Sequence, residues 1–230
     1  VWMTKERAEL LRPLLKLRPG LITNNRLGGG YRGDTDTPEQ RIPATGIPGR
    51  DWEVCMTMNR TWGYKSYDHD WKSVEDLIQK LCDIVSKGGN FLLNIGPRAD
   101  GTIPEASIER LKAVGRWMKV NGEAIYATQA SPFRLMPWGR CTRKNLGNGC
   151  TRLYLHVFHW PADGQLTVPV SNKVSQCYLL ADRTRTCKTT ANDDGLFVHL
   201  NGQAPDAICS VVVLDILGEP EVTVQQILDN

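Results

Sequence analysis

The sequence lacks several features that would mark common classes of protein. It has no apolar run of the ~18–20 residues that a membrane-spanning helix needs, so we expect no membrane partner. Lys and Arg exceed Asp and Glu by only three charges and are interspersed with them, which argues against nucleic acid as a partner. The seven cysteines include no C-x-x-C pair. A zinc site is therefore not expected, and neither is a cofactor.

The cysteines leave two alternatives open. Cys141 with Cys150, and Cys177 with Cys187, are close enough in sequence to close short loops as disulfides. The favoured alternative is that most of the cysteines are buried free thiols, which pack as small hydrophobic side chains. Because seven is an odd number, at least one thiol stays unpaired in either case.

The first four residues, Val-Trp-Met-Thr, contain neither the basic segment nor the apolar segment of a signal peptide. A helical pattern follows at once, as if a strand had just ended. We therefore expect this chain to be part of a longer protein.

The first half of the chain alternates between helical and strand-like patterns, and apolar residues make up 41% of the whole sequence. The pattern predicts a parallel sheet covered by helices, because helices and strands take turns along the chain. The strand at 90–95 is mostly apolar, which predicts burial on both faces. The predicted elements are a helix at 5–17, strands at 21–25, 53–58 and 90–95, a long Gly-rich loop at 27–50, and helices at 73–88 and from 104.

After about residue 131 short strands alternate with polar turns, which is typical of an antiparallel β-sandwich. The turn dipeptides Asp163-Gly164 and Asp194-Gly195 fit this pattern. We place the domain boundary at 128–133, so that residues 1–130 form one domain and 131–230 the other. The predicted strands are 153–158, 165–170, 177–180, 196–200 and 211–216.

Four polar clusters in the first half carry the functional signal. They are Asn24-Asn25-Arg26, Thr37-Pro38-Glu39-Gln40, Trp52-Glu53 with Thr61-Trp62-Gly63-Tyr64, and Ser86-Lys87-Gly88-Gly89-Asn90 leading into Asn94-Ile95-Gly96-Pro97. Together they resemble glycoside hydrolase family 29, the α-L-fucosidases, and the match runs in order through residues 21–126. The resemblance implies a fold of mixed class, α/β plus all-β: part of a (β/α)8-like barrel followed by an antiparallel β-sandwich.

The resemblance implies a retaining glycosidase that removes terminal α-L-fucose from a fucosylated oligosaccharide or glycoconjugate. Such an enzyme needs two carboxyl groups about 5–5.5 Å apart, one as nucleophile and one as acid/base. Glu39 matches the acid/base of the family best, and Glu53 is the second candidate. The matching position of the nucleophilic Asp would lie upstream of Val1, so this chain is expected to carry only the acid/base side of the site.

Two further residues match the sugar pocket of the family. Arg26 is expected to reach sugar hydroxyls or the nucleophile, because a guanidinium presents a rigid fork of donors; a structural salt bridge is the alternative. Trp62 is expected to form an aromatic wall against the C5-methyl group of fucose, with a place in the core as the alternative. The resemblance implies no metal.

Two other hypotheses remain at this point. One is a non-catalytic carbohydrate-binding or interaction fragment, in which Trp138 and Trp160 would stack on sugars. The other is a pseudoenzyme. Family members are commonly exported or lysosomal, so a secreted, periplasmic or lysosomal location is favoured over a cytoplasmic one. The sequence does not specify the linkage that is cleaved.

Overall fold

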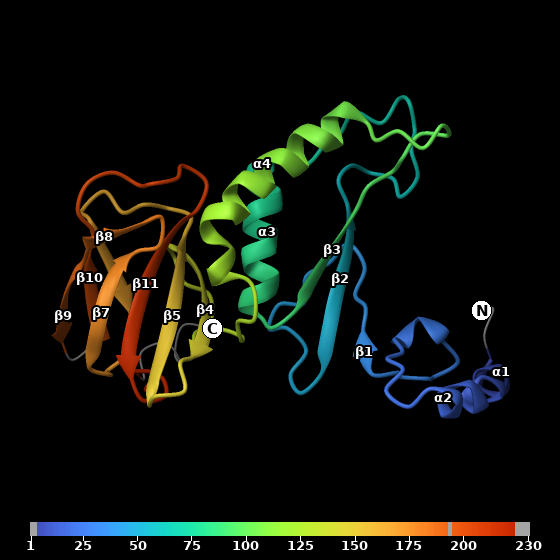
Figure 1. Ribbon diagram of the computed structural model, residues 1–230, viewed down its shortest axis with the longest axis horizontal. Helices are drawn as coiled ribbons and strands as arrows, with labels where there is room; N and C mark the ends of the chain where they lie inside the picture. The colour runs from blue at the N-terminus through green and yellow to red at the C-terminus, as the bar shows by residue number, and fades with distance from the viewer. Residues whose placement is uncertain (1–3, 193–194, 224–230) are drawn as a thin grey trace.

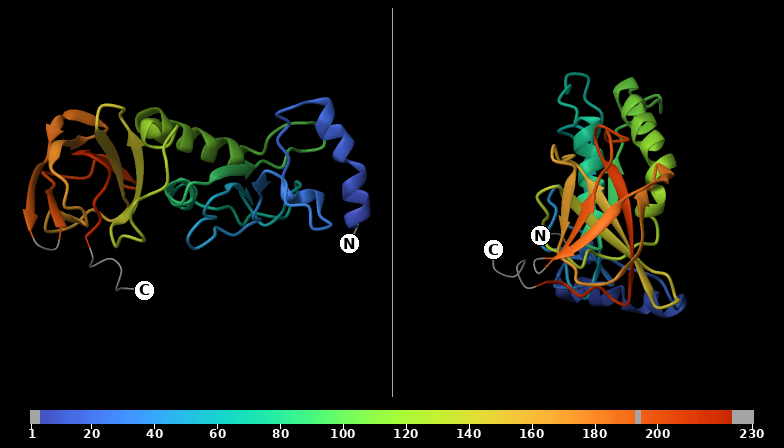
Figure 2. Two further views of the ribbon diagram at one scale, coloured as in Figure 1. Left: turned by 90° about the horizontal axis from the view of Figure 1, so that it is seen from below. Right: turned by 90° about the vertical axis from the view of Figure 1, so that its left-hand side faces the viewer.

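The computed structural model describes residues 4–192 and 195–223 of the chain. The elements follow one another along an elongated molecule (Figures 1 and 2). A small parallel sheet and two short N-terminal helices lie on one side of helices α3 and α4, and two antiparallel sheets lie on the other. The fold is thus mixed α/β with antiparallel sheets, as the sequence predicts. Of the helices described, none is both long and apolar enough to cross a membrane.

The predicted helix at 5–17 is two helices, α1 (Lys5–Leu10) and α2 (Arg12–Leu17). The reason is Pro13, which stands in the first turn of α2. Proline has no N–H to donate to the carbonyl four residues earlier, and its ring clashes with that carbonyl. The chain therefore bends at Leu11 and starts a second helix.

The small sheet has the order β1 (Thr35–Asp36), β2 (Asp51–Thr57) and β3 (Asn90–Asn94), and both pairs are parallel. The prediction of a strand at 21–25 is wrong. Within that segment Asn24 makes a single bridge to Thr35, and residues Asn25–Leu27 form the 3₁₀ helix η1. The Asn24 side chain accepts a hydrogen bond from the Arg26 N–H, and such local bonds compete with sheet pairing.

One face of β2 forms the core of this part of the chain. Trp52, Val54 and Met56 are fully buried there and pack with Ile84 of α3. The expectation that β3 is buried on both faces is wrong, since Leu92 in its centre is 51% exposed. Phe91, whose side chain points to the opposite face of β3, packs against this core and is only partly buried.

Helix α3 (Val74–Ser86) begins where the sequence predicts, because the Ser73 hydroxyl accepts a hydrogen bond from the Asp76 N–H at 3.0 Å. It joins β2 to the parallel strand β3. Helix α4 (Glu105–Asn121) follows Pro104 and continues into the 3₁₀ helix η2 (Gly122–Ala124). Figure 1 shows α3 and α4 side by side between the two sheet regions.

The rest of the chain forms two antiparallel sheets, with orders β4-β5-β11-β7-β8 and β6-β10-β9. The predicted strands are all present. Strands β4, β8 and β9 were not predicted, because they are rich in polar residues and lack a regular alternation of apolar side chains. Asp194 of the second predicted turn lies outside the described residues. The strands are β4 (Gly139–Asn145), β5 (Cys150–Val157), β6 (Gln165–Val168), β7 (Val174–Leu179), β8 (Asp182–Thr186), β9 (Lys188–Asn192), β10 (Gly195–His199) and β11 (Ser210–Leu217).

The five-stranded sheet is buried on both faces. Alternate residues of its central strands, such as Leu155 and Val212, pack against the three-stranded sheet. The intervening residues, such as Tyr154 and Val213, pack against Ile78 of α3 and other helical side chains. Successive side chains of a strand point to opposite faces, so the same strands hold the sandwich together and attach it to the helices.

All seven cysteines are free thiols, and Cys82, Cys141, Cys177 and Cys209 are buried. The prediction that most cysteines are buried free thiols is therefore confirmed for those four, and neither of the two possible disulfides is formed.

The two tryptophans considered for sugar stacking pack within the fold instead. Trp138 is buried and donates its indole N–H to the Thr167 carbonyl at 2.9 Å, and Trp160 packs against the sandwich core.

The turn from α3 to β3 depends on Gly89, because a side chain at this position would collide with the core. A Cβ on Gly89 would meet the ring of buried Trp52 at 2.5 Å. We expect Gly89→Ala to destabilise the fold by about 1–3 kcal/mol through overpacking. Gly115→Ala is the matched control, because Gly115 is exposed in α4 with open space around it, and alanine there should stabilise by about 0.5–1 kcal/mol. Urea unfolding measures both, and equal effects would contradict the prediction.

A carboxylate at the end of α4 joins the helices to the five-stranded sheet. Glu123 accepts hydrogen bonds from Arg152 at 2.9 Å, from the Tyr154 hydroxyl at 2.9 Å and from Arg183 at 2.6 Å. Burial raises the pKa of Glu123, but these hydrogen bonds and the charges of the two arginines outweigh it, so the net pKa is lowered. Arg152 also holds Asp215 through two bonds.

Because the folded-state pKa of Glu123 is lowered, its ionisation stabilises the fold above the unfolded-state value of about 4.3 and is lost as the pH falls through the folded value. We expect Glu123→Gln to lose about 1–2 kcal/mol at pH 7, a discounted figure because the side chain is a third exposed. The difference from wild type should shrink below pH 4. Glu219→Gln, which breaks the exposed pair with Arg143, is the control, and a larger loss there would contradict the prediction.

Candidate functional site

The loop between η1 and β2 is ordered around its own charged groups. Arg50 forms an ion pair with Asp36 at 2.7 Å and donates to the carbonyls of Arg32 and Gly33. Gly33 has φ +60°, and a Cβ there would meet the Asn24 backbone at 2.6 Å. The loop therefore packs directly onto the segment before η1, where only glycine fits.

Glu39 lies within the loop predicted at 27–50, but its segment pairs with β2. It forms a parallel bridge with Cys55 of β2, and two backbone hydrogen bonds, Gln40 N–H to Cys55 and Cys55 N–H to Pro38, fix the segment. Thr35 and Asp36 already pair with β2 in the same register. Residues 35–40 thus run beside β2 as a short, interrupted strand, and the carboxylate of Glu39 projects from its edge.

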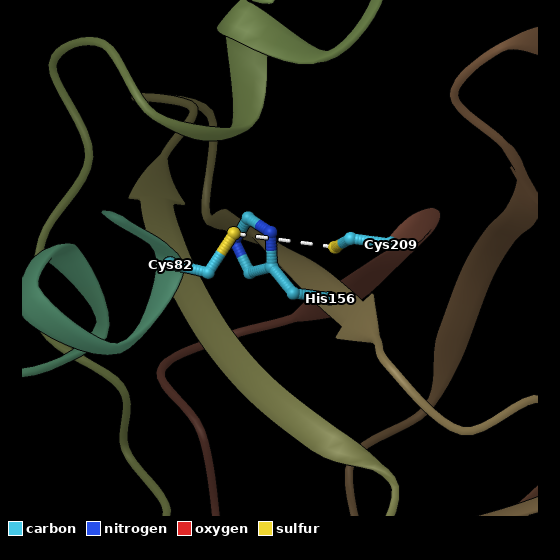
Figure 3. A group of neighbouring side chains, drawn as sticks. All are labelled: Cys82, His156 and Cys209. Atoms are coloured by element: carbon cyan, nitrogen blue, oxygen red, sulfur yellow. Dashed lines mark hydrogen bonds between the residues drawn. The ribbon is translucent and has the colours of Figure 1, made fainter. Parts of the chain in front are cut away.

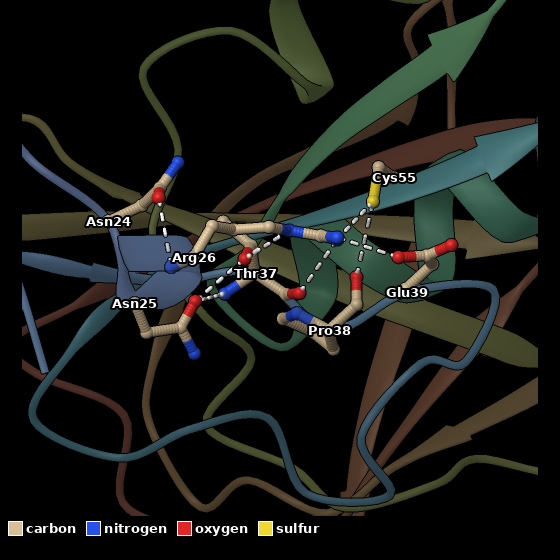
Figure 4. A network of polar contacts seen from close by, with 7 residues as sticks. All are labelled: Asn24, Asn25, Arg26, Thr37, Pro38, Glu39 and Cys55. Carbon is tan, nitrogen blue, oxygen red and sulfur yellow. Dashed lines mark hydrogen bonds and ion pairs between the residues drawn. The ribbon is translucent and has the colours of Figure 1, made fainter. Parts of the chain in front are cut away.

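Arg26 and Glu39 are brought together as an ion pair with 2.7 Å between Nη1 and Oε2 (Figure 4). The other nitrogens of the guanidinium donate to the Thr37 hydroxyl and carbonyl and to the Cys55 sulfur. The hydrogen bond to Glu39 raises the pKa of Arg26. Both side chains of the pair are a little over 40% exposed, so the pair is accessible to a bound molecule.

Asn25 and Thr37 hold this pair in place, although neither was predicted as a site residue. The Asn25 side-chain oxygen accepts from the Thr37 hydroxyl at 2.7 Å and from its N–H at 3.2 Å. The Thr37 hydroxyl in turn accepts from Arg26 Nε at 2.9 Å. Their place in the polar clusters was the available signal, whereas nothing in the sequence pointed to Cys55.

Trp62 lies in the loop after β2 and is 40% exposed. The side chain of Asn94, at the end of β3, donates to the Trp62 carbonyl at 2.7 Å. Gly96 allows residues 62–64 to approach within about van der Waals contact, since a Cβ there would meet Tyr64 N at 3.0 Å. The loop with Trp62 is thereby fixed at the carboxyl ends of two parallel strands, where ligands bind in such sheets.

Asp68 organises the same loop from the inside and was missed by the sequence analysis. Its side chain is buried and accepts from the N–H groups of Arg60 and Asp70 and from the Thr61 hydroxyl. Burial raises the pKa of Asp68, but these bonds outweigh it and the net pKa is lowered. Nothing in the sequence marks Asp68 as buried, because its hydrogen-bond donors all come from the same loop and form no recognisable motif.

An open cavity of about 470 Å³ lies at the carboxyl end of β2. It adjoins the Glu39 segment through Gln40, whose side chain donates to the Thr57 hydroxyl at 3.0 Å. Its polar walls suit a hydroxyl-rich ligand better than an apolar one. The lining residues are Gln40, Thr57, Asn59, Arg60, Asp70 and Lys72.

Glu53 has a less suitable position than Glu39. It is the third residue of β2, opposite Asn90 at the start of β3, and so lies towards the amino end of the strand. Ligands of parallel α/β sheets bind at the carboxyl ends of the strands. The structure thus pairs Arg26 with Glu39 beside Cys55 of β2, and Trp62 lies in the loop that follows the carboxyl end of this strand.

Comparisons with known proteins show which family this chain resembles. A family model described as α-L-fucosidase matches residues 2–123. The human tissue α-L-fucosidase is 32% identical over 196 residues, which cover 82% of this chain and 42% of the human protein. An α-L-fucosidase from Branchiostoma floridae is 36% identical, over 65% of this chain and 34% of its own.

The chain belongs to the α-L-fucosidase family. Among solved structures, α-L-fucosidase isoenzyme 1 from Paenibacillus thiaminolyticus matches 94% of this chain with a TM-score of 0.82 and 35% identity, over 55% of its own length. The GH29 α-L-fucosidase of Bacteroides thetaiotaomicron, solved as a trapped covalent intermediate, matches 90% with a TM-score of 0.79 and 26% identity. The chain spans less than half the length of the curated fucosidases named above.

The tether of the Trp62 loop can be tested in this fucosidase chain. We expect Asn94→Ala to cost about 1 kcal/mol of stability through the lost hydrogen bond and to speed amide exchange at residues 60–64, while α3 stays protected. Gln79→Ala removes a side-chain amide that bonds Glu75 on the exposed surface of α3 and is the control. Unchanged exchange at 60–64 in Asn94→Ala would show that the loop is held by other contacts.

Proposed function

We propose that this chain is the acid/base side of a retaining hydrolase that removes terminal α-L-fucose from glycans. The observation that carries the proposal is the Arg26–Glu39 pair, at one edge of a parallel sheet in a chain of the α-L-fucosidase family. Retention is supported by the Bacteroides relative, which was trapped as a covalent intermediate by means of a Glu-to-Gln variant. A covalent glycosyl-enzyme intermediate is the mark of the retaining mechanism.

In this proposal residues 1–130 are the carboxyl-terminal part of a (β/α)8-like barrel and residues 131–230 are the sandwich domain. The parallel order β1-β2-β3, with α3 as the crossover between the last two strands, supports it. So does the exposed Leu92 on β3, which in a closed barrel would be covered. The nucleophilic carboxylate is then supplied by protein outside these 230 residues.

Glu39 is the proposed proton donor to the departing glycosidic oxygen and, in the second step, the base that activates water. In the ion pair with Arg26 it is a carboxylate, which is the form that the second step needs. To act as an acid it must take up a proton and release Arg26. The half-exposed pair leaves room for this exchange when a sugar enters, and Arg26 is then free to bind sugar hydroxyls.

Trp62 is proposed as the apolar wall of the fucose site, since its loop is fixed at the carboxyl ends of β2 and β3. No cofactor is required by this mechanism. The alternative of a sugar-binding fragment built on the sandwich is less well supported, because the indole N–H of Trp138 is used by a backbone carbonyl. An exported location is supported by the relatives named plasma α-L-fucosidase in man and rat.

The assignment of Glu39 is tested in the complete enzyme with Glu39→Ala and two kinds of substrate. Natural oligosaccharides need full protonation of the leaving group, so their kcat/KM should fall by about 10²–10⁴-fold. Aryl fucosides with good leaving groups should suffer least in the first step. Azide should then restore turnover of the aryl substrate by replacing the base-assisted water.

Glu53→Ala and Glu109→Ala serve as the matched controls. Glu109 is exposed on α4, and its variant should keep full activity. If Glu39→Ala leaves oligosaccharide hydrolysis intact while Glu53→Ala abolishes it with azide rescue, the acid/base is Glu53. Loss of activity in Glu109→Ala as well would point to general damage to the fold.

A further inference from the structure

Two thiols and an imidazole meet in the interface between the helices and the five-stranded sheet (Figure 3). Cys82 comes from α3, His156 from β5, and Cys209 from the residue just before β11. All three are fully buried, and their ligand atoms lie within 4.8 Å of one another. The mechanism proposed above uses none of them, and they lie across the helices from the Glu39 region.

The hydrogen bonds around His156 define its tautomer. The Thr142 hydroxyl, which has one proton, donates it to the Ala124 carbonyl at 2.7 Å. It must therefore accept from His156 Nε2 at 3.1 Å, so that this nitrogen carries the proton. The lone pair is then on Nδ1, on the side of the cysteines.

Nδ1 of His156 makes no hydrogen bond of normal geometry with the residues that the structure describes, although the Cys82 thiol interacts with the imidazole. An unpaired buried acceptor costs about 1–3 kcal/mol, so such an atom calls for an explanation. A histidine that donates one ring N–H to a neighbouring oxygen and presents the other nitrogen as a lone pair is arranged as metal-binding histidines are.

The distance between the sulfur atoms separates a metal site from a disulfide. Sγ of Cys82 and Sγ of Cys209 lie 4.0 Å apart. Two thiolates bound to one zinc ion at ~2.3 Å lie ~3.8 Å apart in tetrahedral geometry and ~4.0 Å apart in trigonal geometry. A disulfide requires ~2.05 Å, about 2 Å less than the separation of the two sulfur atoms here.

We propose that Cys82, Cys209 and Nδ1 of His156 bind one Zn²⁺ ion. Two thiolates and a neutral imidazole balance the charge of Zn²⁺, as a fully buried site requires, and sulfur and imidazole donors suit this metal. Binding releases the two thiol protons to solvent and changes no oxidation state. The chain supplies three ligands, and a small exogenous ligand such as water completes the coordination or the site stays trigonal.

The role of this ion is structural, because its ligands join α3 to two strands of the sandwich at a place closed to solvent. The three ligands are far apart in sequence, so the site exists only when the two regions are docked. Zinc should therefore stabilise the docked state by mass action, since it binds the folded but not the separated arrangement.

The test uses the complete protein, stripped of metal with a chelator under reducing conditions and titrated with Zn²⁺ alone against a chromophoric competitor. We expect one zinc ion per chain and a melting temperature that rises on binding. Co²⁺ in place of zinc should give the thiolate-to-cobalt charge-transfer absorption and the intense visible bands of a low-symmetry site. These readouts need no variant and do not depend on fucosidase activity.

Variants then assign the ligands. Cys82→Val and Cys209→Ala should each weaken zinc binding by at least ~100-fold, more than the loss of a group that only supports a ligand. Cys141→Ala is the matched control, because Cys141 is equally buried but lies in the sandwich core, and it should bind zinc as wild type does. If a variant fails to fold, the cobalt spectrum of the wild-type protein still decides.

Three results would overturn the proposal. One is that folded, stripped wild-type protein takes up no zinc, and another is that Cys82→Val retains the ion with unchanged affinity. The third is a thiol count on the isolated protein that is two short and is restored by reductant, with the peptides of Cys82 and Cys209 linked. That result would assign the pair as a disulfide.

Discussion

The structure depends on the burial of helix α3 on two sides. Ile84 packs with Trp52, Val54 and Met56 of the parallel sheet, while Ile78 and Cys82 pack against the outer face of the five-stranded sheet. A single helix thus belongs to both cores. The parallel sheet that carries the candidate site and the antiparallel sandwich are positioned by the same set of side chains.

Ion pairs determine how the helices are oriented on the five-stranded sheet. Asp83 of α3 pairs with Lys87 in its own helix and with Arg140 of β4, and Glu123 bonds Arg152 and Arg183 of the sandwich. The two pairs of Asp83 are largely buried, so removing one partner there leaves a costly charge behind, whereas Arg183 is mostly exposed. Apolar contact alone would allow the helices to slide over the sheet, whereas these pairs select one arrangement.

The ion pair in the candidate site is more exposed than the pairs of Asp83. Arg26 and Glu39 are half exposed and are held in place by Asn25, Thr37 and the strand β2 beside them. A pair in this position is stable enough to fix geometry, yet exposed ion pairs contribute little to folding. It can therefore be exchanged for contacts with a sugar at low cost, which suits residues proposed to act on a substrate.

The sequence by itself determined the regular elements and the family. Ser73 and the apolar spacing of 74–86 specified α3, and the polar clusters gave the α-L-fucosidase resemblance, because these signals are local. The tertiary structure alone decided the rest. It replaced the strand at 21–25 with η1, because the Asn24 side chain accepts a hydrogen bond from the backbone N–H of Arg26, and paired Glu39 with Arg26 across the loop. It also brought together Cys82, His156 and Cys209, which no local pattern relates, since contacts between distant segments depend on how the sheets and helices pack.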